Sequence, residues 1–151
     1  MSSLALRSLE PNDLQRGYFD VLSALTVAPT PSQQAFNERV ELMRAHDVNV
    51  FVVVDEESDR IAGTVTVLIE PKMARELAFV AHVEDVAVHA QYQGRAIGQR
   101  LLRHACDFAK ARGCYKVILD ASEKNGGFYE KGLLEKRFSI DLILYRHLLQ
   151  Q

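Results

Sequence analysis

The sequence predicts an α/β (α+β) fold in which a β-sheet is flanked by helices. The apolar runs Val50–Val54 and Ile61–Ile69 are separated by six polar residues, which is typical of a β-hairpin. The segment Ile97–Ala111 has apolar residues at helical spacing. A strand pattern at His82–Val88 precedes this helix and the apolar run Cys114–Asp120 follows it, so strands and helices alternate in the second half.

The first third of the chain predicts one strand and two helices. The strand covers Leu4–Leu9, and Pro11 then begins a helix with one apolar side, formed by Leu14, Tyr18, Val21, Leu22 and Leu25. Two prolines in residues 28–32 end this pattern. Ser32 is the expected cap of the second helix, whose apolar side comprises Phe36, Val40 and Met43.

The second half predicts a helix and two strands after the hairpin and the strand His82–Val88. Helix Ile97–Ala111 is expected to bury Ile97, Leu101, Ala105, Phe108 and Ala109. It ends in a cationic turn followed by Gly113. The strand Cys114–Asp120 follows, and a final strand is predicted where apolar residues alternate at Phe138, Ile140, Leu142 and Leu144.

Length and composition predict one domain over residues 1–151, because 48% apolar residues are enough for a continuous core. A net charge of −2 argues against a general nucleic-acid binder, which needs clustered Lys and Arg. The chain has no apolar stretch of about 18 residues, so we expect no membrane span. With no apolar run at Met1–Leu9 either, we expect a cytoplasmic protein.

Cysteine and histidine give no sign of a metal site. Cys106 and Cys114 lack paired metal spacing, so we interpret both as reduced core residues in a reducing compartment. The five histidines are scattered along the chain. We therefore expect no metal.

The segment Gln93-Gly94-Arg95-Ala96-Ile97-Gly98 is a candidate anion-binding loop. Small residues at a helix start let backbone N–H groups converge on a phosphate, with the positive end of the helix dipole behind them. A Walker loop would need Gly-Lys-Ser/Thr here, and the dinucleotide fingerprint would need another glycine and a following βα unit with an acidic ribose ligand. A simple turn before a buried helix remains an alternative for this motif alone.

The pattern Gln93-x-x-Ala96-x-Gly98 resembles the pyrophosphate loop of GNAT N-acetyltransferases, with Ala96 in place of the commoner glycine. More narrowly, the chain is similar to the eukaryotic-type glucosamine 6-phosphate N-acetyltransferases. The matching blocks are His82–Val88, Tyr92–Gly94, Gly113–Asp120, Glu123–Asn125 and Phe128–Lys131.

This resemblance implies a GNAT fold, with a central mixed, mostly antiparallel sheet splayed between the strands His82–Val88 and Tyr115–Asp120. It implies that acetyl-CoA, as cosubstrate, donates its acetyl group to the amine of D-glucosamine 6-phosphate by direct attack in a ternary complex. The product, N-acetyl-D-glucosamine 6-phosphate, belongs to UDP-N-acetylglucosamine biosynthesis. The family also implies a homodimer whose sugar site is completed by the partner subunit. Alternatives are another small-amine or protein N-acetyltransferase, or a non-catalytic acyl-CoA sensor.

The resemblance also assigns the residues that bind the cosubstrate. Backbone groups of the strand before the loop are expected to pair with the pantetheine arm, and the Val86 N–H faces the thioester oxygen. Asn125 is expected to bond the same arm, although an ordinary capping role would select the same residue type. The complete set is Val86, Ala87, Val88, Gln93, Gly94, Arg95, Ala96, Ile97, Gly98, Gln99, Asn125 and Tyr129.

Glu84, Asp120 and Tyr129 are the expected catalytic residues. Glu84 and Asp85 interrupt an apolar strand, where a carboxylate is costly unless paired or solvated, although either could simply end the strand or pair with His82. Asp120 ends a strand, where ligands of α/β sheets collect, and is expected to accept a proton from the substrate ammonium; a helix cap is the alternative. The Tyr129 phenol can donate a proton to the leaving thiolate, unless it is only a half-buried helix residue.

The phosphate of the substrate needs cations that the cosubstrate does not use. Lys72, Arg75 and Lys116 match family positions that line the sugar-phosphate site, and Arg146 corresponds to a basic residue supplied by the partner subunit. Ordinary solvated Lys and Arg residues are the alternative. The full expected substrate set is Thr26, Lys72, Met73, Ala74, Arg75, Glu84, Asp85, Val86, Tyr115, Lys116, Asp120 and Arg146.

Overall fold

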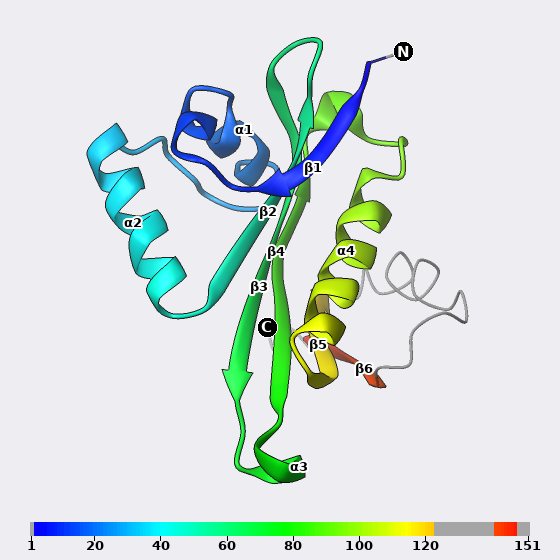
Figure 1. Cartoon of the computed structure of the whole chain (residues 1–151). Coiled ribbons are helices and arrows are strands. Elements are labelled where there is room, and N and C mark those ends of the chain that lie inside the picture. Colours follow the sequence, from blue (N-terminus) through cyan, green and yellow to red (C-terminus); the bar gives the residue numbers. More distant parts are fainter. Residues whose placement is uncertain (1, 123–140, 148–151) are drawn as a thin grey trace.

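The computed structural model describes residues 2–122 and 141–147, whose strands form one mixed sheet in the order β1-β2-β3-β4-β5-β6 (Figure 1). Strands β1 to β4 are antiparallel neighbours, whereas β5 pairs parallel with β4, and β6 pairs parallel with β5. The strands cover Leu4–Ser8 (β1), Val48–Asp55 (β2), Arg60–Pro71 (β3), Phe79–Val88 (β4), Cys114–Ser122 (β5) and Asp141–His147 (β6). This confirms the mixed α/β sheet that the sequence predicts.

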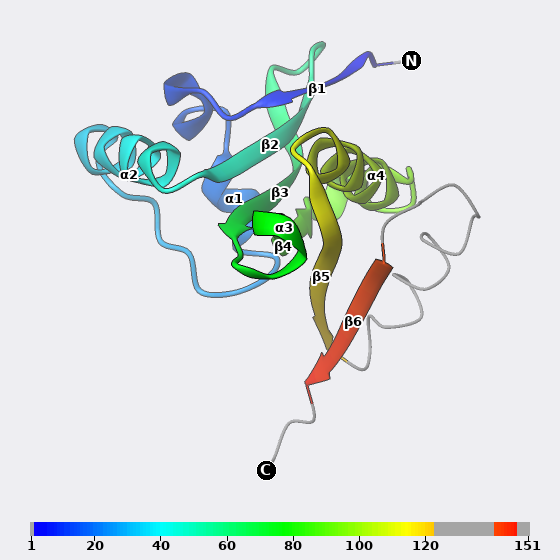
Figure 2. The same ribbon diagram turned by 60° about the horizontal axis from the view of Figure 1, so that its bottom comes forward.

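Helices cover both faces of the sheet (Figures 1 and 2). Helices α1 (Tyr18–Leu22) and α2 (Gln33–Ala45) pack on one face, and α4 (Ile97–Ala111) packs on the other. Alternate residues of β2 therefore enter different cores: Val52 lies beneath α1 and α2, and Val53 lies beneath α4. The short elements are η1 (Pro11–Leu14), α3 (Ala74–Leu77) and η2 (Ala90–Tyr92).

The single helix predicted from Pro11 is wrong, because the chain forms η1 and α1 instead. Gly17 separates them with φ 83°, a left-handed conformation that interrupts a right-handed helix. Tyr18 and Val21 are buried as expected, whereas Leu25 follows the helix and is 46% exposed. The expected contribution of Leu25 to the core is therefore also wrong.

Helices α2 and α4 agree with the sequence analysis. The Ser32 hydroxyl accepts a hydrogen bond of 3.2 Å from the Ala35 N–H at the start of α2, and α4 has the predicted bounds Ile97–Ala111. The sheet approaches the first turns of α4 closely at Gly63 of β3. A Cβ at this glycine would lie 2.9 Å from Ile97 Cγ2 and 3.0 Å from Leu101 Cδ1. Gly63 thus allows the sheet to set the position of the N-terminus of α4.

The last strand and the cysteines can be compared with prediction in part. The described strand β6 covers Asp141–His147, while residues 138–140 of the predicted strand lie outside the described residues. Cys106 and Cys114 are free and buried, as expected for reduced core residues. Burial raises the pKa of Cys106 to about 11. Within the described part of the chain, none of the helices combines the length and apolar character that crossing a membrane requires.

A buried carboxylate joins β1 to η1. Asp13 is fully buried, and its oxygens accept hydrogen bonds from Arg7 (2.8 and 2.9 Å), Arg16 (3.3 Å) and the Glu10 N–H (2.8 Å). Burial alone would raise the pKa of Asp13, but the hydrogen bonds from Arg7 and the other donors outweigh it, so the pKa lies below its usual value.

We expect Asp13→Ala to lower the free energy of unfolding by about 3 kcal/mol, because it leaves two guanidinium groups without their buried partner. Because the pKa of Asp13 is lowered on folding, its contribution is complete above its unfolded-state pKa of about 4 and is lost as the pH falls through the folded value. Urea unfolding between pH 7 and pH 3 measures this. The deficit of the variant should shrink at low pH, and a deficit independent of pH would contradict the ionic explanation.

Candidate functional site

Strand β4 changes course at a β-bulge near its carboxyl end. Thr66 of β3 pairs with Glu84 and Thr64 pairs with Ala87, so Asp85 and Val86 together lie opposite one residue of β3. Asp85 has φ 49°, which is unusual for a residue with a side chain. Such a bulge bends the strand and redirects its side chains and backbone groups.

The bulge coincides with the separation of β4 from β5. The parallel pairing begins at Phe79↔Cys114, and the last pair in the described residues is Val83↔Leu119. From Glu84 to Val88 the strand still follows β3, but the edge facing β5 has no ladder partner in the described part of the chain. These strands are therefore splayed where the sequence predicts it, and backbone groups of Glu84–Val88 are available to a ligand.

The candidate anion loop leads from β4 into α4. Gly94 and Ala96 both have positive φ, 80° and 57°, and Ala96 is the N-cap of the helix. The first N–H bonded within the helix is that of Arg100, which donates to the Ala96 carbonyl at 3.0 Å. The N–H groups of Ile97, Gly98 and Gln99 therefore precede the helical ladder, and the dipole of a 15-residue helix favours an anion beside them.

A cavity of about 700 Å³ lies between this loop and the end of β4. Its volume is in the range of small-molecule and cofactor sites. The structure thus brings together the loop and the strand that the sequence analysis assigned to the cosubstrate. The lining residues are Ala24, Leu25, Val86, Ala87, Val88, Tyr92, Gln93, Gly94, Ala96, Ile97, Gly98 and Gln99.

Three lining residues, Ala24, Leu25 and Tyr92, are absent from the predicted set. Ala24 and Leu25 follow α1, and the sequence offered no signal for them, because Leu25 fits the helical core pattern equally well. Tyr92 directly precedes the loop, and its aromatic side chain at that position was the one sequence feature that could have indicated a place in the cavity lining. Arg95 does not line the cavity: its guanidinium carbon lies 5.3 Å from the centre of the Tyr92 ring.

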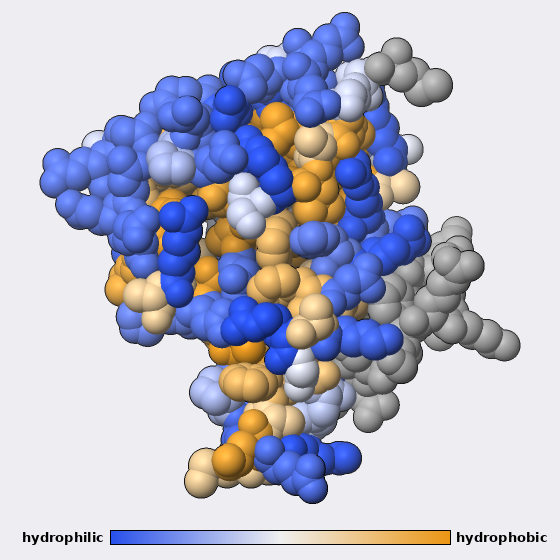
Figure 3. Space-filling model, in the orientation of Figure 1, coloured by the Kyte–Doolittle hydropathy of each residue, from blue (hydrophilic) through white to orange (hydrophobic). Residues whose placement is uncertain are grey.

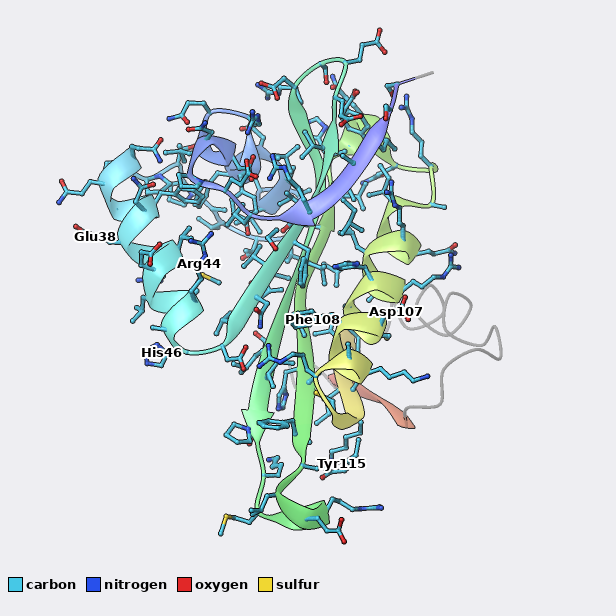
Figure 4. All side chains as sticks on the ribbon, viewed as in Figure 1. Glu38, Arg44, His46, Asp107, Phe108 and Tyr115 are labelled. Atoms are coloured by element: carbon cyan, nitrogen blue, oxygen red, sulfur yellow. The ribbon has the colours of Figure 1, made fainter. Side chains whose placement is uncertain are left out.

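The predicted phosphate-binding cations gather at the other end of β4. Arg75 and Lys116 both lie against Tyr115, with the Arg75 guanidinium carbon 5.3 Å and the Lys116 Nζ 5.5 Å from the ring centre. Figure 4 shows Tyr115 close to α3, at the tip where β3 turns into β4. Such contacts hold cations near an aromatic ring while leaving N–H donors free for an anion.

Lys72 is the most constrained of these cations. Its Nζ lies 2.5 Å from Glu70 Oε1, and this hydrogen bond raises the pKa of Lys72. The other oxygen of Glu70 lies 2.5 Å from His82 Nε2. The partner of His82 is therefore Glu70, which removes one alternative explanation for Glu84 and Asp85; both of these are exposed.

The tip itself has a strained backbone and a mixed surface. Three successive residues, Arg75, Glu76 and Leu77, have φ between 55° and 61°, a region that costs about 1–2 kcal/mol for each side-chain-bearing residue. Met73 is 88% exposed and lies beside the charged Arg75 and Glu76. Figure 3 shows apolar and hydrophilic surface side by side at this tip.

The structure separates the cations from the bulge along the sheet. Lys116 pairs with Val80, and Glu84 lies four positions further along β4, or about 13 Å. Asp120 follows Leu119, the last residue of β5 paired with β4, and thus lies in the strand where the splay begins. Arg146 of β6 pairs with Ala121 of β5, and Thr26 is exposed after α1. Asn125 and Tyr129 lie outside the described residues.

Among the described residues, no group of three or more His, Cys, Asp or Glu side chains is arranged to hold a metal ion. The described part of the site presents backbone donors, a cavity and two regions of charge.

Several known proteins are similar in sequence to this chain. Residues 13–133 match the model of the Acetyltransferase (GNAT) family. The chain is 39% identical over 128 residues to the glucosamine 6-phosphate N-acetyltransferase of Arabidopsis thaliana, covering 83% of this chain and 86% of that protein. It is 38% identical over 140 residues to glucosamine 6-phosphate N-acetyltransferase 1 of Oryza sativa subsp. japonica, covering 91% and 85%.

Solved structures give the same result. The crystal structure of glucosamine-6-phosphate N-acetyltransferase from Arabidopsis thaliana superposes with a TM-score of 0.83 at 35% identity, covering 95% of this chain and 98% of that chain. An acetyltransferase of Trypanosoma brucei also superposes with a TM-score of 0.83, at 36% identity, covering 93% and 100%.

Proposed function

The chain belongs to the acetyltransferase (GNAT) family, and we propose that it transfers the acetyl group of acetyl-CoA to the amine of D-glucosamine 6-phosphate. The products are N-acetyl-D-glucosamine 6-phosphate and CoA, and the reaction is a step of UDP-N-acetylglucosamine biosynthesis. The observation that carries this proposal is the continuous path from the bulged end of β4 through the 700 Å³ cavity to the N-terminus of α4.

The residues present fit the cosubstrate. The N–H groups at the start of α4 suit an anion such as the pyrophosphate, and the edge of β4 beyond Val83 suits the amide-bearing pantetheine arm. A Cβ at Gly94 would meet no atom within 4 Å, so the loop has open space beside it. Acetyl-CoA supplies an activated acetyl thioester when bound.

Side chains and backbone groups of the chain provide substrate binding, oxyanion stabilisation and proton transfer. We propose that the Val86 N–H bonds the thioester oxygen as negative charge develops there. Glu84 and Asp85, both exposed at the bulge, hold the sugar amine and hydroxyls. Asp120 accepts the proton of the ammonium group, and Tyr129 donates a hydrogen bond or proton to the departing sulfur.

The cationic cluster of Lys72, Arg75 and Lys116 is the proposed phosphate site. It is supported by the two cations at the Tyr115 ring and by the position of Lys72 beside them. A phosphate dianion gains charge-assisted hydrogen bonds there that an unphosphorylated sugar cannot make.

We expect kcat/KM for glucosamine 6-phosphate to exceed that for glucosamine by about 100-fold, the value of roughly two charged hydrogen bonds. CoA release with a panel of amines measures this. Lys116→Ala should lower the kcat/KM of the phosphorylated sugar about tenfold and leave the affinity for acetyl-CoA unchanged. The matched control is Lys110→Ala, which removes the same charge from an exposed position at the end of α4.

Equal use of both sugars would contradict the phosphate site, and preference for a different amine would favour another N-acetyltransferase activity. If CoA is released with none of the amines although acetyl-CoA binds, the acyl-CoA sensor becomes the better explanation.

We further propose one acetyltransferase domain over residues 1–151, acting as a homodimer in which Arg146 reaches the partner's sugar site. Strand β6 is the edge of the sheet in the described part of the chain, and the apolar residues Leu142–Leu144 suit pairing with a second copy. Sedimentation at micromolar concentration should give about twice 17.0 kDa. A fully active monomer would contradict the dimer.

A cytoplasmic location is also part of the proposal. The buried free thiols of Cys106 and Cys114 are consistent with a reducing compartment.

A further inference from the structure

A hydrogen-bonded carboxylate lies behind the candidate anion loop. The Tyr92 hydroxyl donates to Asp55 Oδ2 at 2.7 Å and lies 3.2 Å from the Ser58 hydroxyl. Tyr92 precedes the loop, whereas Asp55 is the last residue of β2 and Ser58 lies in the turn between β2 and β3. This contact therefore joins two segments that are 37 residues apart in the sequence.

Burial and a second hydrogen bond fix the Asp55 carboxylate that accepts the Tyr92 phenol. It is 6% exposed, and its Oδ1 accepts the Glu57 N–H at 3.1 Å. The hydrogen bond from Tyr92, together with those from Ser58 and Glu57, outweighs desolvation and holds the pKa of Asp55 below its usual value. The carboxylate is therefore charged at neutral pH, and the O–H···O⁻ bond is of the stronger, charge-assisted kind.

The Tyr92 side chain connects the hydrogen bond with Asp55 to the candidate anion loop. Tyr92 is 8% exposed and packs in the same core cluster as Ile97 and Leu101 of α4. The Arg95 guanidinium lies over its ring, and the ring also lines the 700 Å³ cavity. A hydrogen bond at the hydroxyl opposes displacement of the Tyr92 side chain. Because Tyr92 directly precedes Gln93, this bond favours one position of the loop relative to α4.

His89 makes hydrogen bonds at the start of η2, the short helix that ends at Tyr92. Its N–H donates to the Ala62 carbonyl of β3 at 2.9 Å, its carbonyl accepts the Tyr92 N–H at 2.8 Å, and its Nδ1 accepts the Gln91 N–H at 3.2 Å. Backbone contacts thus fix the beginning of η2, and the bond to Asp55 fixes its last residue.

We propose that Asp55 and Tyr92 are positioning residues that preorganise the loop for the pyrophosphate of the acetyl donor. They touch no reacting atom. The inference rests on the proposed function, specifically on pyrophosphate binding by the loop. Preorganisation lowers the ordering cost of binding, so it acts on affinity for a donor that carries the pyrophosphate.

The test compares two acetyl donors. Acetyl-CoA carries the pyrophosphate, whereas S-acetyl-pantetheine has the same thioester arm but lacks the pyrophosphate and the 3′-phosphoadenosine attached to it. Tyr92→Phe and Asp55→Asn should each lower kcat/KM for acetyl-CoA about tenfold, mostly through KM, because a charge-assisted hydrogen bond is lost. Values for S-acetyl-pantetheine should change less than about twofold. The double variant should lose no more than either single one, since both changes break the same bond.

Tyr18→Phe is the matched control. Tyr18 is another buried tyrosine, 6% exposed, whose hydroxyl interacts with Thr64 in the core on the opposite side of the sheet. Removing this hydroxyl should leave the ratio between the two donors unchanged. If Asp55→Asn does not fold, Tyr92→Phe still decides the question, because it keeps the ring and its packing.

Equal losses with both donors would overturn the inference and reduce the Asp55–Tyr92 bond to a stabilising contact. If wild type prefers acetyl-CoA and the ratio of kcat/KM for the two donors is unchanged in both variants, the inference is overturned, while the loop remains the pyrophosphate site. A wild-type enzyme that uses both donors equally well would instead refute pyrophosphate binding by the loop, and the inference with it.

Discussion

Gly98→Asp is expected to weaken acetyl-CoA binding by about three orders of magnitude. Gly98 is buried in the first turn of α4 and lines the 700 Å³ cavity. A carboxylate there would lie against the pyrophosphate, and two like charges about 4 Å apart repel by about 4 kcal/mol at the effective dielectric constant of a protein surface. An acidic residue is electrostatically favourable near a helix N-terminus, which offsets part of the cost of burying the carboxylate.

Thermal unfolding with and without acetyl-CoA measures this effect, because a ligand that binds the folded state stabilises it by RT ln(1 + [L]/Kd) and so raises Tm more when it binds more tightly. Gly98→Ala is the control, since it adds one methyl group and no charge. It should retain most of the stabilisation by acetyl-CoA. If acetyl-CoA stabilised Gly98→Asp as strongly as wild type, the loop would be a structural turn and not an anion site.

Tyr129→Phe is expected to lower kcat by about 100-fold, the usual contribution of a general acid, with little change in acetyl-CoA affinity. The substitution keeps the ring and removes only the hydroxyl that we assign to the leaving thiolate. Single-turnover kinetics separate this step from product release. The pH profile should also lose any decline at high pH that comes from ionisation of the phenol.

The leaving group supplies a sharper control for Tyr129. An acetyl thioester of a more acidic thiol needs less proton donation, so it should recover part of the loss in Tyr129→Phe and gain little in wild type. If kcat stayed unchanged with acetyl transfer rate-limiting, Tyr129 would be a packing residue and solvent would protonate the thiolate.

Local patterns in the sequence determined much of the fold and half of the candidate site. The bounds of α4, the Ser32 cap and the β2–β3 hairpin follow from periodicity and capping, which depend on residues only a few positions apart. The candidate anion loop was also predictable from neighbouring residues. Its signals are the start of a helix and the small residues Gly94 and Gly98, and both are local in the sequence.

Only the tertiary structure decided the features that join distant segments. The contact between Tyr92 and Asp55, the place of Leu25 at the cavity and the bulge at Asp85 depend on which strands and loops lie side by side. Gly17 breaks a helix that periodicity alone would continue, and Arg75 begins a left-handed turn that its own preference opposes. The sequence by itself determined the bounds of α4 and most of the strands, and it predicted the candidate anion loop. Packing across the sheet decided what holds that loop in place, because long-range contacts outweigh local preferences of about 1 kcal/mol for each residue.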